Sequence, residues 1–291
     1  MSQSTSTKKT VLITGCSDGS LGAALATAFH TAGLHVYATT RNPAKMAQLA
    51  ALGIETLALD VLDQSSIDAA ASKVPSLDIL VNNAGSLYAM PFSDLSIPKA
   101  KELFDLNVWS YLAVTQAFLP LLLKSKGMIV NQTSGASVVT VPFQSAYNAS
   151  KAAIAMFSDT QRLELQPFGI TVVDLKTGVT KSNVMNTQKD KPRSLLPKGS
   201  LYEPAKEAVE SSMNGEKLAE GAMETQEYGD LVVRNLLKKK PPPLIWTGGL
   251  NAWLIRIAMF LPFGMLDGTI KKMTGLQRGL ANKIILVLGR Y

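Results

Sequence analysis

The sequence is poor in the residues that build disulfide frameworks and metal centres. Its 291 residues include one cysteine, Cys16, and two histidines, His30 and His35. A single thiol excludes a disulfide framework and a cysteine-based zinc site, and two histidines leave little for a histidine-based metal centre. Charged residues make up only 18% of the chain, against 46% hydrophobic residues. This balance excludes disorder for most of the chain, so we expect one or two folded domains without a metal.

The N-terminal region also lacks a long apolar run. Met1–Lys9 is polar, and the apolar residues Val11–Ile13 are too few for the core of a secretory signal peptide. We therefore expect a cytoplasmic protein, and a reducing compartment also suits a free thiol.

The net charge of +7 is unevenly distributed along the chain. Met1–Asp230 contains 19 basic and 21 acidic residues, whereas Leu231–Tyr291 contains 10 basic residues and one acidic residue. The chain thus has a nearly neutral body and a basic C-terminal region. The basic residues flank an apolar segment and no groove-reading motif accompanies them, so we expect no nucleic-acid partner.

Apolar, β-branched runs alternate with segments of helical composition through most of the chain. This order predicts βαβ units and an α/β fold, a Rossmann-type doubly wound parallel sheet with helices on both faces. The expected strands are Thr10–Thr14, Leu34–Thr39, Glu55–Leu59, Asp78–Val81, Gly127–Asn131 and Ile170–Leu175. The expected helices are Leu21–Ala32, Pro43–Leu52, Ser65–Ser72, Ile97–Leu123 and Ser145–Gln166.

We assign residues 8–237 to this Rossmann domain. Within it, residues 203–230 hold eight acidic residues and few large apolar ones, which predicts a solvated helical excursion on the substrate side. The run Lys238–Pro243 then breaks the pattern. We treat residues 238–291 as a basic and apolar C-terminal extension.

A glycine-rich turn lies between the first expected strand and the first expected helix. Glycines in this context let the backbone approach a pyrophosphate at the helix N-terminus. The turn therefore predicts a dinucleotide site. Its candidate contact residues are Gly15, Ser17, Asp18, Gly19 and Leu21.

The end of the second expected strand distinguishes the two nicotinamide cofactors. An NAD site places a carboxylate there to bind the ribose 2′-hydroxyl, whereas this chain has Arg41. A guanidinium suits a 2′-phosphate. We therefore expect NADPH or NADP+ as the cofactor, with Arg41 at the 2′-phosphate.

Tyr147 and Lys151 are four residues apart at the start of an expected helix, so they share one helical face. A lysine ammonium beside a phenol favours the phenolate, and so lowers the tyrosine pKa from about 10 toward neutral pH. Such a tyrosine is a candidate general acid for a carbonyl oxygen that receives hydride.

These features resemble the short-chain dehydrogenase/reductase family over Thr10–Gly178. The resemblance rests on the glycine turn, on Asp60 after the third strand, and on the run Asn82–Gly85. It rests also on the spacing of four polar residues. Ser134 lies 13 residues before Tyr147, Asn107 lies 40 residues before Tyr147, and Lys151 completes the set.

The resemblance implies a role for each matching residue. Tyr147 would donate a proton to the substrate carbonyl, and Lys151 would lower its pKa and bind the nicotinamide ribose. Ser134 would hydrogen-bond the carbonyl oxygen, and Asn107 would hold a water that links Lys151 to solvent. The resemblance also assigns cofactor contacts to Asp60, Val61, Asn83, Ala84, Gly85, Gly178, Val179 and Ser182.

Two positions depart from the family pattern. Leu21 occupies the place of the third glycine of the turn, and Gly22 comes one residue later, as a one-residue insertion would produce. Thr177 precedes Gly178 where the family usually has proline. The first departure leaves the phosphate contacts of the turn open.

The C-terminal extension has two open interpretations. Leu244–Leu266 contains one charged residue, Arg256, but paired glycines and Pro262 interrupt it, so we do not expect a full membrane span. Its aromatic residues and flanking lysines favour an interfacial position on endoplasmic reticulum or a lipid droplet. Alternatively, the same residues cap the substrate pocket or pack against another subunit.

Within the family, the chain resembles a subgroup that includes fungal NADPH-dependent 1-acyldihydroxyacetone-phosphate reductases. The shared features are Pro142–Ala153, Thr177 with Gly178, and the apolar C-terminal segment. They imply reduction of a hydrophobic or lipid-like ketone to a secondary alcohol, in a homodimer or homotetramer. Steroid, retinoid and fungal secondary-metabolite ketones are the alternative substrates.

A function of another class is suggested by Gly15–Gly19, which also fits the Gly-x-Ser-x-Gly elbow of serine hydrolases with Ser17 as nucleophile. That hydrolase needs a histidine base late in the chain, and the only histidines are His30 and His35. We therefore favour the dinucleotide turn. A cofactor-binding protein without catalysis is a third class, but its usual mark is a degraded catalytic set, and here the set is complete.

Overall fold

The structure is a computed structural model that describes residues 8–181, 193–216, 221–262, 264–274 and 276. Its centre is a sheet of seven parallel strands in the order β3-β2-β1-β4-β5-β6-β7. The predicted doubly wound α/β fold is confirmed. Chain order reverses between β1 and β4, and ligands of such sheets bind beyond the carboxyl ends of the strands at this point. The strands are β1 (Thr10–Thr14), β2 (His35–Thr40), β3 (Glu55–Ala58), β4 (Ile79–Asn82), β5 (Met128–Gln132), β6 (Thr171–Thr177) and β7 (Leu244–Thr247).

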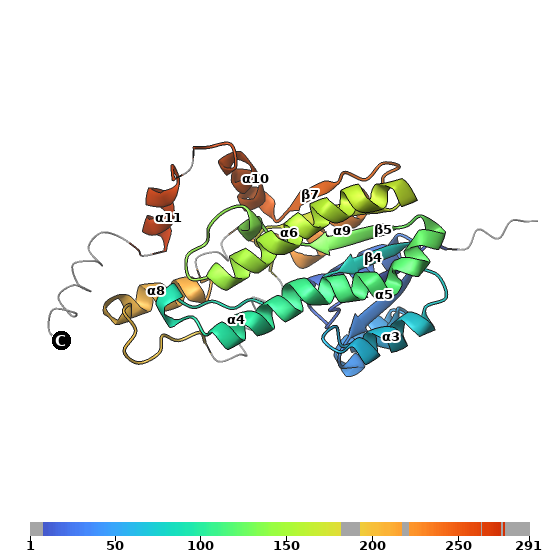
Figure 1. Ribbon diagram of the computed structural model, residues 1–291, viewed down its shortest axis with the longest axis horizontal. Helices are drawn as coiled ribbons and strands as arrows, with labels where there is room; N and C mark the ends of the chain where they lie inside the picture. The colour runs from blue at the N-terminus through green and yellow to red at the C-terminus, as the bar shows by residue number, and fades with distance from the viewer. Residues whose placement is uncertain (1–7, 182–192, 217–220, 263, 275, 277–291) are drawn as a thin grey trace, which may run out of the picture.

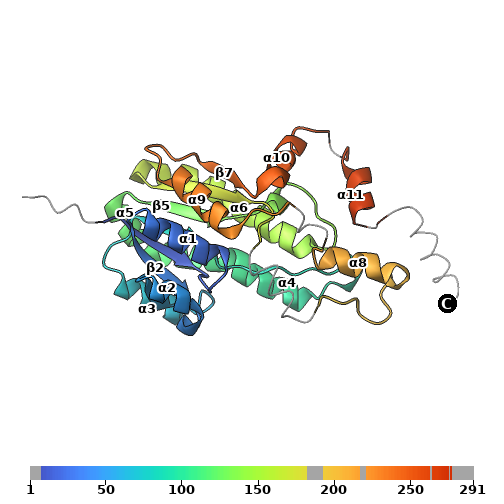
Figure 2. The same ribbon diagram turned by 180° about the vertical axis from the view of Figure 1, so that it is seen from behind.

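Helices cover both faces of the sheet. One group lies toward the viewer in Figure 1, and the other is seen from behind in Figure 2. The first group is α3 (Gln64–Lys73), α4 (Ile97–Phe104), α5 (Ser110–Ser125) and α6 (Ser145–Leu165). The second group is α1 (Leu21–Thr31), α2 (Ala47–Ala51) and α9 (Thr225–Leu236).

The central strand β1 separates two hydrophobic cores. Val11 and Ile13 belong to the core that includes Phe29 of α1, whereas Leu12 belongs to the core that includes Phe118 of α5. This division arises because successive side chains of a strand point to opposite faces. The continuous apolar strands of the sequence therefore have a simple cause, since both faces of each strand are buried.

The structure moves two of the predicted domain boundaries. Residues 225–230 belong to α9, which packs so closely on α1 that a Cβ atom at Gly229 would lie 2.7 Å from the Ala24 carbonyl oxygen. They are part of the sheet domain and not of a solvated excursion. The sheet domain also continues past residue 237, because β7 pairs with β6. β7 was not predicted from the sequence, because it is short and an apolar run follows it directly.

The remainder of the acidic segment lies beside the carboxyl end of the sheet. It forms the short turn Glu203–Ala205 and α8 (Lys206–Met213). Val209 and Met213 of α8 are buried in a third, smaller core together with Phe143. The segment is therefore anchored next to the loop that precedes α6.

Within the part of the chain that the structure describes, β7 is followed by α10 (Gly249–Ala258) and α11 (Asp267–Met273). At 1.5 Å per residue, the ten residues of α10 extend about 15 Å, roughly half of a bilayer's hydrocarbon core. Among the described residues, the stretch long and apolar enough to cross a membrane is Ile97–Ser125, and this is the core helix that covers the sheet. α10 is thus too short to cross a hydrocarbon core of this thickness by itself.

Candidate active site

The four predicted catalytic residues meet at the carboxyl edge of the sheet. Tyr147 and Lys151 lie on the first two turns of α6, and Ser134 follows β5. Asn107 lies in a π-helical turn, Asp105–Trp109, between α4 and α5. Parallel strands end at one edge, so residues from three separate parts of the chain are brought together there.

Tyr147 is half-buried and contacts Ser134. Burial raises the pKa of the phenol above its ordinary value of 10, and a hydrogen bond with the Ser134 side chain opposes this increase. The phenol is therefore protonated at neutral pH, the state that an acid needs. Ser134 is itself held in a tight turn, where its Oγ accepts a hydrogen bond of 3.1 Å from the Ala136 amide.

Lys151 is buried behind the tyrosine. Its Nζ atom donates a 2.8 Å hydrogen bond to the Gln132 carbonyl oxygen and lies 6.0 Å from the centroid of the Tyr147 ring. Burial lowers the pKa of Lys151 to about 8, and the Asp174 carboxylate opposes this decrease. The sequence predicts that Lys151 lowers the pKa of Tyr147, but in the structure the burial of the phenol has the larger effect.

Asn107 ties α6 to the loop after β4. Its Oδ1 accepts a hydrogen bond from the Ser86 amide at 2.9 Å, and its Nδ2 donates to the Ser86 carbonyl oxygen at 3.0 Å and to Ser150 Oγ at 3.1 Å. Gly85 has little room for a side chain, because a Cβ atom would lie 3.1 Å from Asn107 Oδ1. The structure thus gives Asn107 a positioning role, and the bound water implied by the family stays a prediction.

The glycine turn packs tightly against the loop after β4. Gly15 has a φ of +76°, and a Cβ atom there would lie 2.9 Å from Ala84 Cα. A Cβ atom at Gly22 would lie 2.5 Å from the Gly15 carbonyl oxygen. Gly22 therefore supplies the close helix packing expected of the third glycine, while Leu21 opens α1 one residue earlier.

Asn83 fixes this arrangement. Its Nδ2 donates to the carbonyl oxygens of Thr14 at 2.7 Å and Gly15 at 3.2 Å, and its amide nitrogen donates to Thr14 Oγ1 at 3.0 Å. The side chain predicted to line the cofactor therefore also holds the turn in shape.

The turn lies beside the end of β2, where Arg41 follows the strand. The Cys16 amide donates to the Thr39 carbonyl oxygen at 2.9 Å, and the Asp18 amide donates to the Lys45 carbonyl oxygen at 2.7 Å. Both Arg41 and Lys45 are exposed. Two cations next to a glycine turn fit a phosphate on the adenosine ribose.

The other predicted cofactor contacts are spread along the same edge. Asp60 Oδ1 accepts from the Leu62 amide at 3.0 Å, and Val61 is buried. The Gly178 amide donates to the Thr247 carbonyl oxygen at 2.7 Å, and Val179 accepts from the Met223 amide at 3.1 Å. Ser182 and the rest of residues 182–192 lie outside the described residues.

A dinucleotide fits these residues. The backbone cradle around Gly15 would be filled by a side chain, as expected where a pyrophosphate approaches the main chain. At the other end of the edge, Thr247 Oγ1 is buried and has no hydrogen-bond partner within the described part of the chain. Tyr147 and Lys151 lie between these two ends, where the nicotinamide ribose would be held.

Several functional residues were not predicted from the sequence. Gln132 accepts from Lys151 and Tyr111 through its carbonyl oxygen and from Tyr228 through its side chain. The buried ion pair between Asp174 and Lys176 was also missed. The sequence carries a signal of this ion pair, because an acidic and a basic residue lie two positions apart in a segment that is otherwise largely apolar. The sequence carries no signal of the backbone contacts of Gln132.

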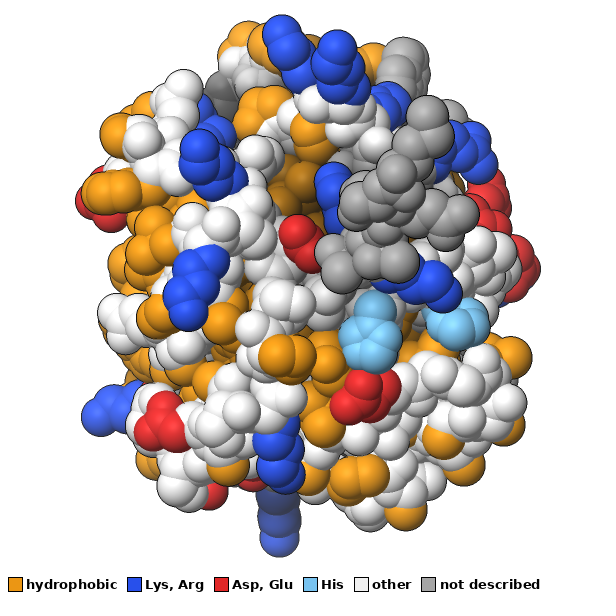
Figure 3. All heavy atoms as spheres, turned by 90° about the vertical axis from the view of Figure 1, so that its right-hand side faces the viewer, with side chains coloured by type: hydrophobic (Ala, Val, Ile, Leu, Met, Phe, Trp, Pro, Cys, Tyr) orange, Lys and Arg blue, Asp and Glu red, His pale blue; other side chains and the backbone are white. Residues whose placement is uncertain are grey.

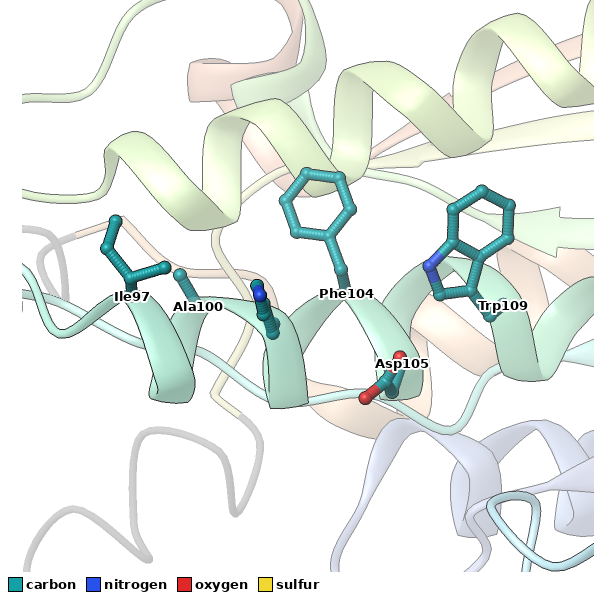
Figure 4. A pocket seen from close by; sticks show the side chains of 6 residues that line it. Ile97, Ala100, Phe104, Asp105 and Trp109 are labelled. Atoms are coloured by element: carbon teal, nitrogen blue, oxygen red, sulfur yellow. The ribbon is translucent and has the colours of Figure 1, made fainter.

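A groove lies away from these residues, on the outer side of α4. It has a volume of about 490 Å³ and is shallow. Figure 4 shows Ile97, Phe104 and Trp109 projecting from the same side of this helix. Trp109 is 52% exposed and also contacts the Phe157 ring of α6. An apolar surface of this kind suits contact with another protein surface.

Neither histidine lies near Ser17, where the hydrolase hypothesis requires a histidine base. His35 pairs in register with Thr10, at the amino end of β1, whereas Ser17 follows its carboxyl end. His30 lies in the last turn of α1, and Ser17 precedes the first. Figure 3 shows the face at the amino ends of the strands, where histidine, acidic and apolar side chains are interspersed. His35 forms an ion pair of 3.0 Å with Glu55 there.

Comparison with known proteins places the chain in a family. The short chain dehydrogenase family model matches residues 9–193. A short-chain dehydrogenase/reductase of Pestalotiopsis microspora is 56% identical over 272 residues, which cover 94% of this chain and 96% of the relative. The NADPH-dependent 1-acyldihydroxyacetone phosphate reductase of Schizosaccharomyces pombe is 34% identical over 91% of this chain and 93% of its own.

Among solved structures, a short-chain dehydrogenase from Streptomyces avermitilis superimposes with a TM-score of 0.73. It is 28% identical, and the match covers 94% of this chain and 97% of that chain. The chain described here belongs to the short-chain dehydrogenase family. It is therefore an oxidoreductase, and the family predicted from the sequence is confirmed.

Proposed function

We propose that this enzyme reduces a hydrophobic ketone to a secondary alcohol with NADPH. The observation that carries the proposal is the half-buried Tyr147, whose side chain contacts Ser134 and has the Lys151 Nζ atom 6.0 Å from its ring centroid. A protonated phenol can donate to a carbonyl oxygen, whereas alcohol oxidation would require its conjugate base. The raised pKa of Tyr147 therefore leaves the phenol protonated and able to donate a proton at neutral pH.

Each residue of the site has a defined task. Ser134 hydrogen-bonds the carbonyl oxygen and orients it toward the Tyr147 hydroxyl, which donates the proton. Lys151 binds the nicotinamide ribose and supplies positive charge beside the tyrosine. NADPH supplies the hydride when it is bound. Arg41, with Lys45 beside it, binds the 2′-phosphate and selects NADPH over NADH.

The proposed substrate is a lipid-like ketone such as 1-acyldihydroxyacetone phosphate. Support comes from the reductase of Schizosaccharomyces pombe that shares 34% identity, and from the small apolar core that Phe143, four residues before Tyr147, forms with Val209 and Met213 of α8. Ile255 of α10 contacts the turn after Ser134, because a Cβ atom at Gly135 would lie 2.8 Å from Ile255 Cδ1. α10 therefore brings an apolar side chain next to the carbonyl site. Steroid, retinoid and fungal secondary-metabolite ketones are the alternatives.

NADPH oxidation over a panel of ketones tests the proposal. The panel contains 1-acyldihydroxyacetone phosphate, a steroid ketone, a polyketide ketone and a short, polar ketone, with the aldehyde retinal as the retinoid, each with NADPH and with NADH. We expect turnover with NADPH and at least one apolar ketone, with short, polar ketones reduced more slowly. Turnover of esters without any NADPH-dependent reduction would instead support the Ser17 hydrolase.

A peripheral membrane position is the second part of the proposal. Apolar side chains are exposed at the end of α10 and in the loop that follows it, and Phe260 is 86% exposed. Lys271 and Lys272 lie nearby in sequence on α11. Apolar side chains together with lysines favour an anionic lipid surface. The exposed apolar residues are Ile257, Met259, Phe260, Leu261 and Met265.

A homodimer or homotetramer is the third part. The groove on α4 presents Ile97, Phe104 and Trp109, and a second copy of the chain is the proposed occupant, because members of the family often form oligomers. Light scattering of the purified protein tests this. We expect a mass of at least twice 31.2 kDa, and a monomer in the variant Ile97→Lys with Trp109→Lys.

A further inference from the structure

We propose that the buried pair Asp174–Lys176 is a positioning device for the catalytic Ser134. The pair holds the two residues that bracket the turn of Ser134, namely Thr133 before it and Ser137 after it. The inference rests on the proposed function, because it assigns a role toward the serine that orients the carbonyl.

The geometry of the pair is specific. Asp174 and Lys176 lie two residues apart on β6, so both side chains point to the same face of the sheet. Lys176 Nζ lies 2.7 Å from Asp174 Oδ2, and the side chains are only 7% and 8% exposed. Both charges are therefore nearly removed from water, in a strand whose other buried residues are largely apolar.

Each member of the pair reaches one side of the serine turn. The Thr133 hydroxyl donates a hydrogen bond to Asp174 Oδ1, and Lys176 Nζ donates one of 3.0 Å to Ser137 Oγ. The Ser137 hydroxyl in turn donates to the Ser134 carbonyl oxygen at 2.6 Å. A continuous chain of contacts thus runs from the ion pair to the backbone of Ser134.

Burying the charges of Asp174 and Lys176 costs free energy of folding, so their presence at this position calls for a role. Burying two charges requires that both be paired and hydrogen-bonded, and an apolar pair of similar volume would often stabilise a core equally well. Here the unused hydrogen-bonding capacity of the pair is directed at Thr133 and Ser137. The Asp174 carboxylate also acts on Lys151, whose pKa it raises against the effect of burial.

Apolar packing alone does not fix the turn that contains Ser134. Gly135 follows Ser134, and Ile255 of α10 packs directly on it. An apolar helix pressing on one side of the turn would not fix the direction of the Ser134 hydroxyl. The hydrogen bonds that Asp174 accepts from Thr133 and that Lys176 donates to Ser137 can do so, because hydrogen bonds are directional.

Ser137→Ala is the sharpest single test, since it cuts the link to Ser134 and leaves the ion pair intact. A misplaced reacting group costs up to about 10²-fold in rate, so we expect a fall in kcat of about tenfold with Ser137→Ala and more with Lys176→Met. KM for the ketone and the NADPH dissociation constant should change less than about twofold. Ser125→Ala is the matched control, because it removes a hydroxyl that donates at 2.6 Å to the Leu77 carbonyl oxygen at the opposite end of the sheet.

The same substitutions are then made in a Ser134→Ala background. If they act through Ser134, they should lower kcat by less than about twofold there, because coupled residues are not additive. Equal losses in both backgrounds would indicate a general structural effect and overturn the inference, as would an unchanged kcat for Ser137→Ala in the native background.

Two precautions keep the result interpretable. Lys176→Met leaves Asp174 unpaired and can prevent folding, so the double variant Asp174→Leu with Lys176→Met removes both charges together. It should show the same dependence on Ser134. Unchanged turnover in Ser134→Ala and Tyr147→Phe would refute the proposed function itself, whereas additive losses with both of these variants impaired would refute only the positioning role.

Discussion

The carboxyl edge of the sheet and the C-terminal helices differ in which kinds of side chain they bury and which they expose. At the edge, buried polar groups such as Asn107 and Lys151 are held by hydrogen bonds to their neighbours. In the segment from α10 to α11, apolar side chains are exposed and basic residues flank them. The edge fixes atoms in place for chemistry. The C-terminal segment presents a surface, and it contacts the edge through Ile255.

Tyr147→Phe should produce the largest effect and tests whether the chemistry resides at the edge alone. Removing the acid should lower kcat by about 10³-fold, within the range ascribed to general acid catalysis. Stopped-flow or steady-state NADPH oxidation measures this, and fluorescence titration should give unchanged NADPH binding. Tyr37→Phe is the matched control, because Tyr37 is a buried tyrosine of β2. Retained turnover in Tyr147→Phe would contradict the mechanism.

Arg41→Ala should have the next largest effect, and it separates cofactor choice from catalysis. Loss of a hydrogen bond to a charged group costs about 1.5–3 kcal/mol, which is roughly 10- to 100-fold in affinity. KM for NADPH should rise by about that factor, while KM for NADH and kcat change little. Arg162→Ala, a surface arginine of α6, is the control. An equal loss with both cofactors would count against a 2′-phosphate site.

The pH profile tests the electrostatics of the edge. The pKa of Lys151 is lowered from 10.5 to about 8, so its ammonium form predominates below pH 8 and is lost above it. kcat/KM should therefore fall as pH rises through about 8, by about tenfold per pH unit for one group. Asp174→Asn should move this fall to lower pH, because Asp174 raises the Lys151 pKa. A flat profile up to pH 10 would show that the charge of Lys151 is not needed.

Phe260→Glu should have the smallest effect on chemistry and tests the C-terminal segment directly. Burial of a phenylalanine contributes about 1.5–3 kcal/mol, so sedimentation with phosphatidylserine vesicles should show at least about tenfold weaker binding. Turnover of a water-soluble ketone should stay within about twofold. Phe168→Glu is the control, because this exposed phenylalanine lies in the turn after α6. Equal losses in the two variants would argue against a specific lipid surface.

Local sequence patterns predicted most of the fold and named four catalytic candidates that the structure brings together. Six strands were predicted from their apolar runs, because buried parallel strands must be apolar along their length. The order of the helices between these strands was predicted as well. The helix that carries Tyr147 begins at Ser145, as predicted. β7 was missed, since a strand of four residues beside an apolar helix leaves no separate pattern.

What the sequence determined by itself is the chemistry at each position: a phenol, an ammonium, a hydroxyl and an amide at fixed spacings, and an arginine where an NAD enzyme has an acid. The tertiary structure decided how these groups behave. It raised the pKa of Tyr147, lowered that of Lys151 and engaged the amide of Asn107 with Ser86, because burial and neighbours from distant parts of the chain set those properties. It also joined Asp174, Lys176 and Ser137 to Ser134, a contact that spacing cannot predict because β5 and β6 become neighbours only on folding.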